Sequence, residues 1–339
     1  MGNRMGGRSG FTMVELLAVL AIVGLLAALL IPAVQSSREA ARGAACRNNL
    51  RQAILGVLQF ESRSGALPGL YNGGFQPRPR SAIEEFHFHP WRTAILPGIE
   101  RADVFASLNL ELPATVAANQ TGLNAAIGTF VCPSSANPTR NLPELYAWND
   151  GQVPTVRFGS AARADYEVVG GIHTRPPGTA PGPGGVTLQL VLDGVAFGAW
   201  GEPTYREPTV FSTGYRRARL ADVTDGLSNT ALIGERAGRP DCYEKGKAVD
   251  PYPYSDPVAG CGDPHQAAWG VSTHFSWLLS MAGQPVNSTN RIGFHAFHPV
   301  GAHAAMGDGS VRALRESTAP VVLQALATRS GGEAVSTGD

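Results

Sequence analysis

The sequence predicts an α+β protein in which a long N-terminal helix packs on an antiparallel β-sheet head with long loops. Three observations predict this fold. Residues 11–31 are almost entirely apolar, residues 33–62 continue with helix-forming residues, and Gly and Pro concentrate after them. Strand candidates follow the helix instead of alternating with helices, which favours an antiparallel sheet. They are Thr187–Leu192, Val195–Trp200, Ala231–Ile233 and Trp269–Leu279.

We expect three parts, which are a polar leader over residues 1–10, a helix over 11–62 and an extracytoplasmic head over 63–339. The 339 residues are 43% hydrophobic, which is ample for a packed core. Formal net charge is +0, so no global field attracts a polyanion and we expect no nucleic-acid partner. The sequence has no nucleophile elbow, helical zinc-protease motif or phosphate-binding loop, so we expect neither an enzyme nor a cofactor.

The first helical segment, residues 11–31, is long enough to be a membrane span. At about 1.5 Å per residue it reaches roughly 32 Å. Glu15 is its only charge, and Arg4 and Arg8 precede it. By the positive-inside rule we expect a single-pass protein of the inner (cytoplasmic) membrane, with a cytoplasmic N-terminus and a periplasmic or extracellular head.

Two other interpretations of this segment are a cleaved secretory signal peptide and a plain signal anchor. A signal peptide has an apolar stretch of about 7–15 residues and a small-residue cleavage site. This stretch is longer, and Pro32 and Val34 follow it without a clear site. A plain anchor gives no reason for Glu15, because a carboxylate costs free energy in hydrocarbon unless it has a partner.

The segment Gly10–Leu17 resembles the prepilin leader junction of type IV pilins and type II secretion pseudopilins. The resemblance implies that a prepilin peptidase/N-methyltransferase cuts between Gly10 and Phe11 and methylates the new N-terminus. Other pilin-like subunits and membrane lipid are then the expected partners. Glu15 would pair with the N-terminal ammonium of a neighbouring subunit, which offsets the desolvation of both charges. Pro32 falls where pilins often carry a helix-kinking proline.

The second half of the helix shows one apolar stripe. Its residues recur at spacings of three and four, and they are Cys46, Leu50, Ile54, Val57 and Leu58. The arginines of this segment lie largely off the stripe. We therefore expect this half to pack against a sheet and to end near Ser62–Gly65, where Gly65 and Pro68 act as stop signals.

Six blocks of the chain form an ordered set of motifs. They are Cys46–Gln52; Trp91–Glu100; Phe130–Ser134; Asp225, Gly226, Leu227, Ser228, Asn229 and Thr230 with Gly234–Glu235; His298 with Asp308 and Gly309; and Ala325–Glu333. In this order they resemble the family catalogued as domain of unknown function 1559. Gly98 and Ile99 depart from the usual pair there, which alters local packing, and Gly307 replaces a common alanine. The resemblance implies a pilin-like architecture and location, but little about function.

The four cysteines divide into two expected disulfides. Cys242 and Cys261 flank a Pro- and Gly-rich stretch that we expect to be a loop with little regular structure. A Cys46–Cys132 bridge would fasten the long helix to the head. The alternative is two buried reduced thiols, and we favour the bridge because the compartment is oxidising on the expected topology.

The polar motifs have structural and ligand-binding interpretations. Asp308 and Gly309 predict a hairpin turn in which both positions have positive φ, and the alternative is an Asp308–His298 metal or ligand pair. Asp225 and Gly226 predict a turn that precedes strand Ala231–Ile233. The side chains of Ser228 and Asn229 would satisfy the backbone donors of this turn.

Two further metal interpretations remain beside these turns. Asp222, Asp225 and Glu235 could supply calcium oxygens. His87 and His89 could be half of a transition-metal site. Since calcium wants six to eight oxygens and single histidines are more often packed, we expect no metal centre.

The favoured function is a pilin-like or pseudopilin structural subunit that assembles through its N-terminal helix, in secretion or surface filaments. The alternative is a membrane-tethered extracytoplasmic binding protein that uses a pilin-type export signal and acts alone. Its basis is the size of the head, which exceeds what a filament subunit needs.

Overall fold

The structure is a computed structural model. It describes residues 12–69, 71–72, 89–112, 114, 116–136, 142, 145–146, 157–169, 171–173, 195–197, 218–249, 267–271, 285–290, 293–330 and 332.

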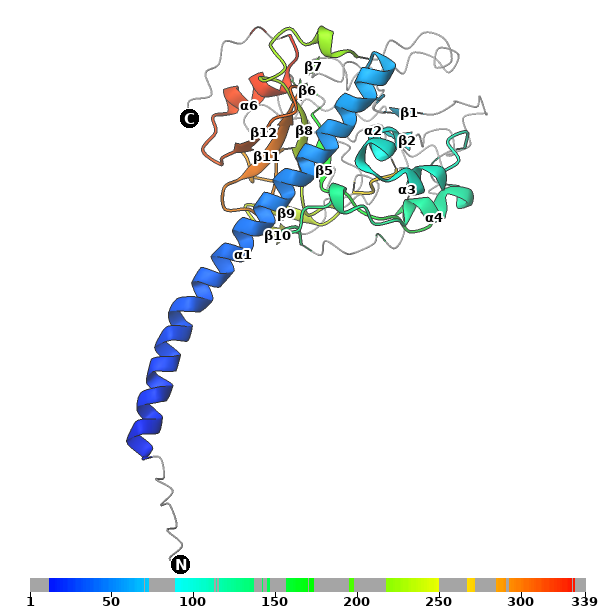
Figure 1. The fold of residues 1–339 in the computed structure, drawn as a ribbon. Coiled ribbons are helices and arrows are strands. Elements are labelled where there is room, and N and C mark those ends of the chain that lie inside the picture. The colour runs from blue at the N-terminus through cyan, green and yellow to red at the C-terminus, as the bar shows by residue number, and fades with distance from the viewer. Residues whose placement is uncertain are drawn as a thin grey trace, which may run out of the picture.

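Helix α1, Met13–Ser64, dominates the architecture. Its first half projects from the head as a rod, and its second half crosses the head (Figure 1). Thr12 caps the N-terminus, and Gly65 ends the helix in the left-handed conformation, as the stop signals predicted. Pro32 lies inside the helix without ending it.

The head combines short helices with short antiparallel strands. The helical segments are α2 Trp91–Ile95, η2 Leu96–Ile99, α3 Ala102–Ala106, η3 Ala117–Asn119, α4 Gln120–Leu123, η4 Gly128–Phe130, η5 Leu220–Asp222 and α6 Pro320–Ala327. The strands are β1 Tyr71–Asn72, β2 His89–Pro90, β3 Leu145–Tyr146, β4 Arg157–Phe158, β5 Tyr166–Val168, β6 Gly171–His173, β7 Val195–Phe197, β8 Ala231–Glu235, β9 Cys242–Glu244, β10 Lys247–Val249, β11 Ala302–Met306 and β12 Val311–Leu314.

A four-stranded antiparallel sheet in the order β12-β11-β8-β5 forms the centre of the head. Ala304 is paired with Arg312 on one side and Gly234 on the other, so β11 is an inner strand. The predicted α+β fold with a long helix on an antiparallel sheet is therefore confirmed.

The sheet is covered on both faces. On one face Ala305 of β11 and Ile233 of β8 belong to the same core as Leu50 and Ile54 of α1. On the other face alternate β11 residues join a second core with Leu323 and Leu326 of α6; these are Ala302, Ala304 and Met306. The period-two alternation of β11 thus separates the helix layers.

Helix α1 and segment η2 approach each other closely at two glycines. A Cβ on Gly98 would lie 3.2 Å from the Cα of Gly56, and a Cβ on Gly56 would lie 2.9 Å from Ile99 Cγ2. The departure at Gly98 and Ile99 noted in the sequence therefore lies in a contact that is tight for a Cβ at position 98.

The predicted strands had mixed outcomes. Ala231–Ile233 lies in β8, and part of Val195–Trp200 forms β7. The described part of Trp269–Leu279, residues 269–271, is not a strand, and Thr187–Leu192 lies outside the described residues. The stretch after Cys242 was expected to lack regular structure, and this was wrong for its start, because β9 and β10 form a hairpin there.

Candidate functional site

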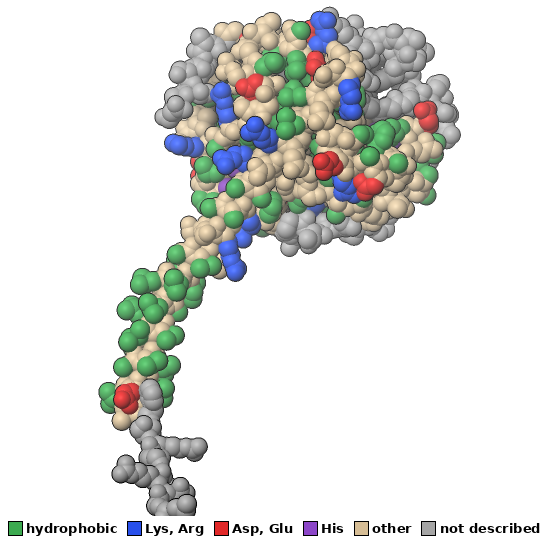
Figure 2. Space-filling view, in the orientation of Figure 1, with side chains coloured by type: hydrophobic (Ala, Val, Ile, Leu, Met, Phe, Trp, Pro, Cys, Tyr) green, Lys and Arg blue, Asp and Glu red, His purple; other side chains and the backbone are tan. Residues whose placement is uncertain are grey.

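The exposed surface of the outer half of α1, from Met13 to Pro32, is the first candidate site. None of its residues before Cys46 is buried, and exposure reaches 79% at Met13 and 67% at Leu29. Hydrophobic side chains cover much of the face of the rod seen in Figure 2, and large exposed hydrophobic residues occur along it from Met13 to Val34. The helix contains a stretch long and apolar enough to cross a membrane. An apolar surface of this size requires lipid or other protein to cover it.

The tip of the rod carries Glu15. Its Oε2 accepts hydrogen bonds from the backbone N–H of Thr12 at 2.9 Å and from Thr12 Oγ1 at 2.7 Å. In return Thr12 Oγ1 accepts from the Glu15 N–H at 3.3 Å, which completes a capping box. The predicted processing residues Gly10 and Phe11 lie outside the described residues.

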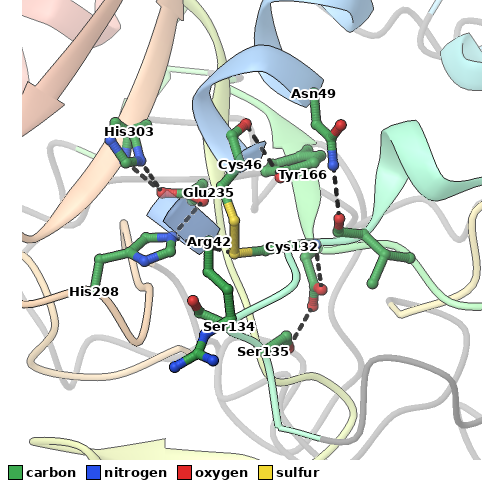
Figure 3. Close-up of a disulfide and its surroundings, with 12 residues drawn as sticks. Arg42, Cys46, Asn49, Cys132, Ser134, Ser135, Tyr166, Glu235, His298 and His303 are labelled. Atoms are coloured by element: carbon green, nitrogen blue, oxygen red, sulfur yellow. Dashed lines mark hydrogen bonds and ion pairs between the residues drawn. A yellow bond between two sulfur atoms is a disulfide. The ribbon is translucent and has the colours of Figure 1, made fainter. Parts of the chain in front are cut away.

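The second candidate site is a buried cluster where α1 enters the head, centred on a disulfide between Cys46 and Cys132 (Figure 3). The two Cα atoms are 5.0 Å apart, and 86 positions separate the residues in the sequence. Cys46 is the first buried residue of α1, and Cys132 follows η4. The bridge therefore fastens the helix to the head, as favoured from the sequence.

Hydrogen bonds fix both ends of the disulfide. Asn49 Nδ2, one turn after Cys46, donates to the carbonyls of Gly128 at 3.0 Å and Val131 at 2.9 Å. The N–H of Cys132 donates to Asp165 Oδ2 at 3.0 Å. Since the bonds to Val131 and Asp165 are half-buried or buried, the position of each cysteine is determined by its surroundings as well as by the disulfide.

His298 lies against the disulfide and between two carboxylates. Its Nε2 is 3.2 Å from Cys132 Sγ, and its Nδ1 is 2.9 Å from Glu39 Oε1. Glu39 also accepts from Ser134 Oγ at 2.7 Å and from Arg42 Nε at 2.8 Å. Helix α1 thus contributes both a cysteine and the carboxylate that orients the imidazole.

Glu235, at the end of β8, completes the cluster and has no exposed surface. Its Oε2 accepts from the His303 N–H at 2.7 Å and pairs with His303 Nδ1 at 2.8 Å. Its Oε1 has no hydrogen-bond partner and lies 3.6 Å from His298 Nε2. A buried carboxylate oxygen left unpaired is costly, so its orientation toward His298 requires an explanation.

Charges within the cluster shift its pKa values. Burial alone would lower the pKa of His298, but the hydrogen bonds and charges of Glu235 and Glu39 outweigh burial and raise it. Burial alone would raise the pKa of Glu235, but His298 and His303 lower it. With the disulfide formed, the two carboxylates therefore favour the protonated form of His298 more than water does, and His298 in turn favours the ionised form of Glu235.

The motif blocks meet at two places in the head. Cys46, Cys132, Glu235 and His298 come from four different blocks and share the buried cluster. The Asp225–Thr230 turn instead meets the β11–β12 turn, where the Gly307 N–H donates to the Thr230 carbonyl at 3.0 Å.

These turns support the structural interpretations of their polar residues. Asp308 Oδ1 accepts from the Ser310 N–H at 2.9 Å at the β11–β12 turn, away from the contacts of His298, so the two do not form the considered pair. Only Gly309 of that turn has a positive φ, of 84°, and the expectation of two such positions was wrong. Asn229 Nδ2 donates to the Asp225 carbonyl at 3.2 Å, which closes the Asp225–Thr230 turn containing Gly226 and Ser228.

The other metal interpretations find no support among the described residues. Asp222 pairs with Arg219, Asp225 accepts from the Gly332 N–H, and Glu235 belongs to the buried cluster. His89 Nε2 bonds the Leu112 carbonyl at 2.9 Å, and His87 lies outside the described residues. Cys242 is disulfide-bonded, and its expected partner Cys261 is likewise outside them.

Sequence reasoning missed two contributors to the buried cluster, Glu39 and His303. Glu39 had a readable signal, because it lies seven residues before Cys46 and so continues the apolar stripe with an acid. His303 had none, because only the pairing of β11 with β8 brings it to Glu235.

Two known families match the sequence of the chain. Residues 5–31 match the prokaryotic N-terminal methylation motif, so this is a prepilin-type, pilin-like protein with a membrane anchor. Residues 35–321 match the family described as protein of unknown function (DUF1559), and the chain belongs to that family. The chain matches no curated protein and no solved structure.

Proposed function

We propose that the chain is a pseudopilin-like structural subunit of the inner membrane that assembles through the outer half of α1. A prepilin peptidase/N-methyltransferase would remove residues 1–10 and methylate Phe11. The head would lie in the periplasm or outside the cell. No chemistry is required of the subunit, whose role is to present the head and to pack its helix against other pilin-like subunits.

The observation that carries the proposal is the exposed apolar surface of the outer half of α1. Its apolar side chains surround the helix, whereas an amphipathic helix of a soluble protein has one apolar stripe. Fully burying one Leu or Val side chain gains about 1.5–3 kcal/mol, and this surface has many of them. Lipid covers such a rod before assembly, and neighbouring rods cover it afterwards.

Glu15 supports assembly over simple anchoring. Within one chain its carboxylate only satisfies the exposed cap at Thr12. In hydrocarbon this arrangement leaves a negative charge without a cation. Cleavage after Gly10 creates an ammonium at Phe11, and the ammonium of an adjacent subunit would neutralise Glu15 and set the stagger between helices.

The Cys46–Cys132 disulfide is the main support for an insertion that leaves the head outside the cytoplasm. Arg4 and Arg8 precede the span, but Arg38 and Arg42 follow it, so charge alone is a weak guide. Long domains are translocated largely regardless of charge. The Cys46–Cys132 disulfide is the stronger support, because disulfides persist in oxidising compartments.

Processing is tested by substituting the leader glycines. In a cell that has a prepilin peptidase, Gly10→Leu should abolish cleavage, while the matched control Gly7→Leu should be cleaved normally. Intact-mass spectrometry would show a wild-type chain that begins with N-methylated Phe11. A mature wild-type chain that begins at Met1, or that lacks the apolar stretch, would contradict the proposal.

Assembly is tested by photocrosslinking from position 20 on the bare rod. The wild type should give a ladder of crosslinked subunits. Glu15→Gln should remove the ladder, and Glu61→Gln, the control acid at the other end of α1, should keep it. Processed, membrane-bound chains without crosslinks to any pilin-like subunit, and without filaments in electron microscopy, would favour the tethered binding protein instead.

A further inference from the structure

We propose that the buried cluster of Cys46, Cys132, Glu235 and His298 binds a divalent transition metal ion, zinc above others, when its cysteines are in the dithiol form. The disulfide and the metal would then be alternative links at one place. Within the described part of the chain, this is the only group that brings at least three possible ligand atoms together, all within 4.8 Å of one another.

The distances match a tetrahedral site. With zinc–sulfur bonds of about 2.3 Å and zinc–nitrogen and zinc–oxygen bonds of about 2.0–2.1 Å, sulfur–nitrogen edges are about 3.6 Å and nitrogen–oxygen edges about 3.4 Å. His298 Nε2 lies 3.2 Å from Cys132 Sγ and 3.6 Å from Glu235 Oε1. The two sulfurs would separate to about 3.8 Å across the ion, and the four ligand atoms already lie within 4.8 Å of one another.

The surroundings prepare the two non-sulfur ligands. Glu39 accepts at His298 Nδ1, which turns Nε2 toward the sulfurs, and a carboxylate in this position is the usual support of a metal-bound imidazole. His303 holds Glu235 Oε2, while Oε1 remains without a hydrogen bond although buried. Among the described contacts this oxygen has only the 3.6 Å ion pair with His298 Nε2, and a metal ion would coordinate it directly.

The ligand set and burial select the ion and its role. Two thiolates with one imidazole and one carboxylate suit Zn²⁺, whereas Ca²⁺ and Mg²⁺ prefer oxygen alone. All four residues are buried, with exposure of 3% or less. Four protein ligands without an open position define a structural site, so the metal would hold α1 on the sheet without catalysing a reaction.

Conversion between the two forms is a balanced exchange. A dithiol reductant forms its own disulfide and leaves two thiols at Cys46 and Cys132, so two electrons and two protons enter the site. Zn²⁺ then binds the two thiolates and the neutral imidazole of His298, which releases both thiol protons and any proton that His298 carries. An oxidant that reforms the disulfide expels the ion.

Cobalt titration of the full-length chain in detergent tests the proposal. Under anaerobic conditions, the chain reduced with a dithiol should bind one Co²⁺ and show thiolate-to-cobalt charge transfer with tetrahedral visible bands. Zn²⁺ should displace the Co²⁺. The oxidised chain should show neither signal. His298→Gln and Glu235→Gln should each weaken binding by at least tenfold.

A control variant and a second, independent measurement complete the test. Cys46→Ser/Cys132→Ser retains Cys242 and Cys261, so any signal that survives in it belongs to those thiols and would overturn the assignment. In case the variants fold poorly, thermal unfolding of the wild type gives an independent answer. Zn²⁺ should raise the melting temperature of the reduced chain and leave that of the oxidised chain unchanged; no rise in the reduced chain would overturn the proposal.

Discussion

Helix α1 is one continuous element with two unlike halves. The outer half, from Met13 to Pro32, is apolar on every side and buries nothing within the chain. The inner half buries one stripe against the head and keeps Arg47 and Arg51 exposed. The two halves share the same backbone hydrogen bonding, so side chains alone decide which surroundings each half requires.

The difference shows that the residues that favour a helix do not by themselves determine where that helix packs. A helix that is apolar all round has no preferred face, and any apolar surroundings satisfy it. A helix with one stripe has a single orientation on its sheet. Orientation of the head relative to the rod is therefore set between Cys46 and Val57, where the stripe is buried.

The largest effect should come from removing the link at the boundary of the two halves. In the loop-closure model, a disulfide spanning 86 positions contributes about 4.5 kcal/mol to the free energy of unfolding. Cys46→Ser/Cys132→Ser, measured by denaturant unfolding of the oxidised protein, should lose most of this. Membrane association, which depends on the outer half, should not change; if stability is unaltered, the bridge does not fasten the helix.

A charge placed on the outer half should prevent insertion. Leu20→Arg replaces a favourable residue at the span centre and should cost about 3–4 kcal/mol of insertion free energy. Leu55→Arg, on the exposed side of the inner half, is the matched control. Carbonate extraction should release the first variant from membranes and retain the second, and equal retention would remove the distinction between the halves.

Truncation should have opposite consequences in the two halves. Leu50→Ala empties a fully buried position and should lower the free energy of unfolding of the head by about 3 kcal/mol. Leu26→Ala changes a side chain exposed in the single chain and should alter the unfolding of the head by less than about 0.5 kcal/mol. Comparable losses in the two variants would mean that the rod also packs on the head.

Protonation of His89 in mild acid should lower the free energy of unfolding of the head. Burial lowers the pKa of His89 from its usual value of 6.5, so the folded head binds that proton later than the unfolded chain does. Stability is complete above pH 6.5 and falls as pH drops below it, by at most about 1.4 kcal/mol per pH unit for one proton.

His89→Gln retains a donor for the Leu112 carbonyl and should remove this part of the pH dependence. Denaturant unfolding at pH 7 and pH 5 measures it. An identical pH dependence in wild type and variant would assign the acid sensitivity to other groups.

Features that depend on local spacing could be predicted from the sequence. Periodicity and the residues around Gly65 predicted the helix end and the buried stripe, because these depend on local spacing. The hairpin at Asp308 and Gly309 was predictable for the same reason, but its turn geometry was not. Cys46 and Cys132 could be paired only from their apolar surroundings and the expected oxidising compartment, because no local spacing relates them.

Contacts between distant segments were the limit of prediction. The buried cluster needs α1, the segment after η4, β8 and the segment before β11 to meet, and no spacing rule relates these four segments. Glu235 was interpreted only as part of a family block or as a calcium ligand, because its actual partner His303 is 68 positions away. Long-range strand pairing, which determines this contact, has no local signature.

The location of Cys46 has a mechanical consequence. It is the first buried residue that a pull along the rod would meet on entering the head. Tension from a filament, or from a machine that extends and retracts one, would therefore load a covalent bond before it could peel the helix away turn by turn. The head would bear force as one body instead of unzipping from its membrane end.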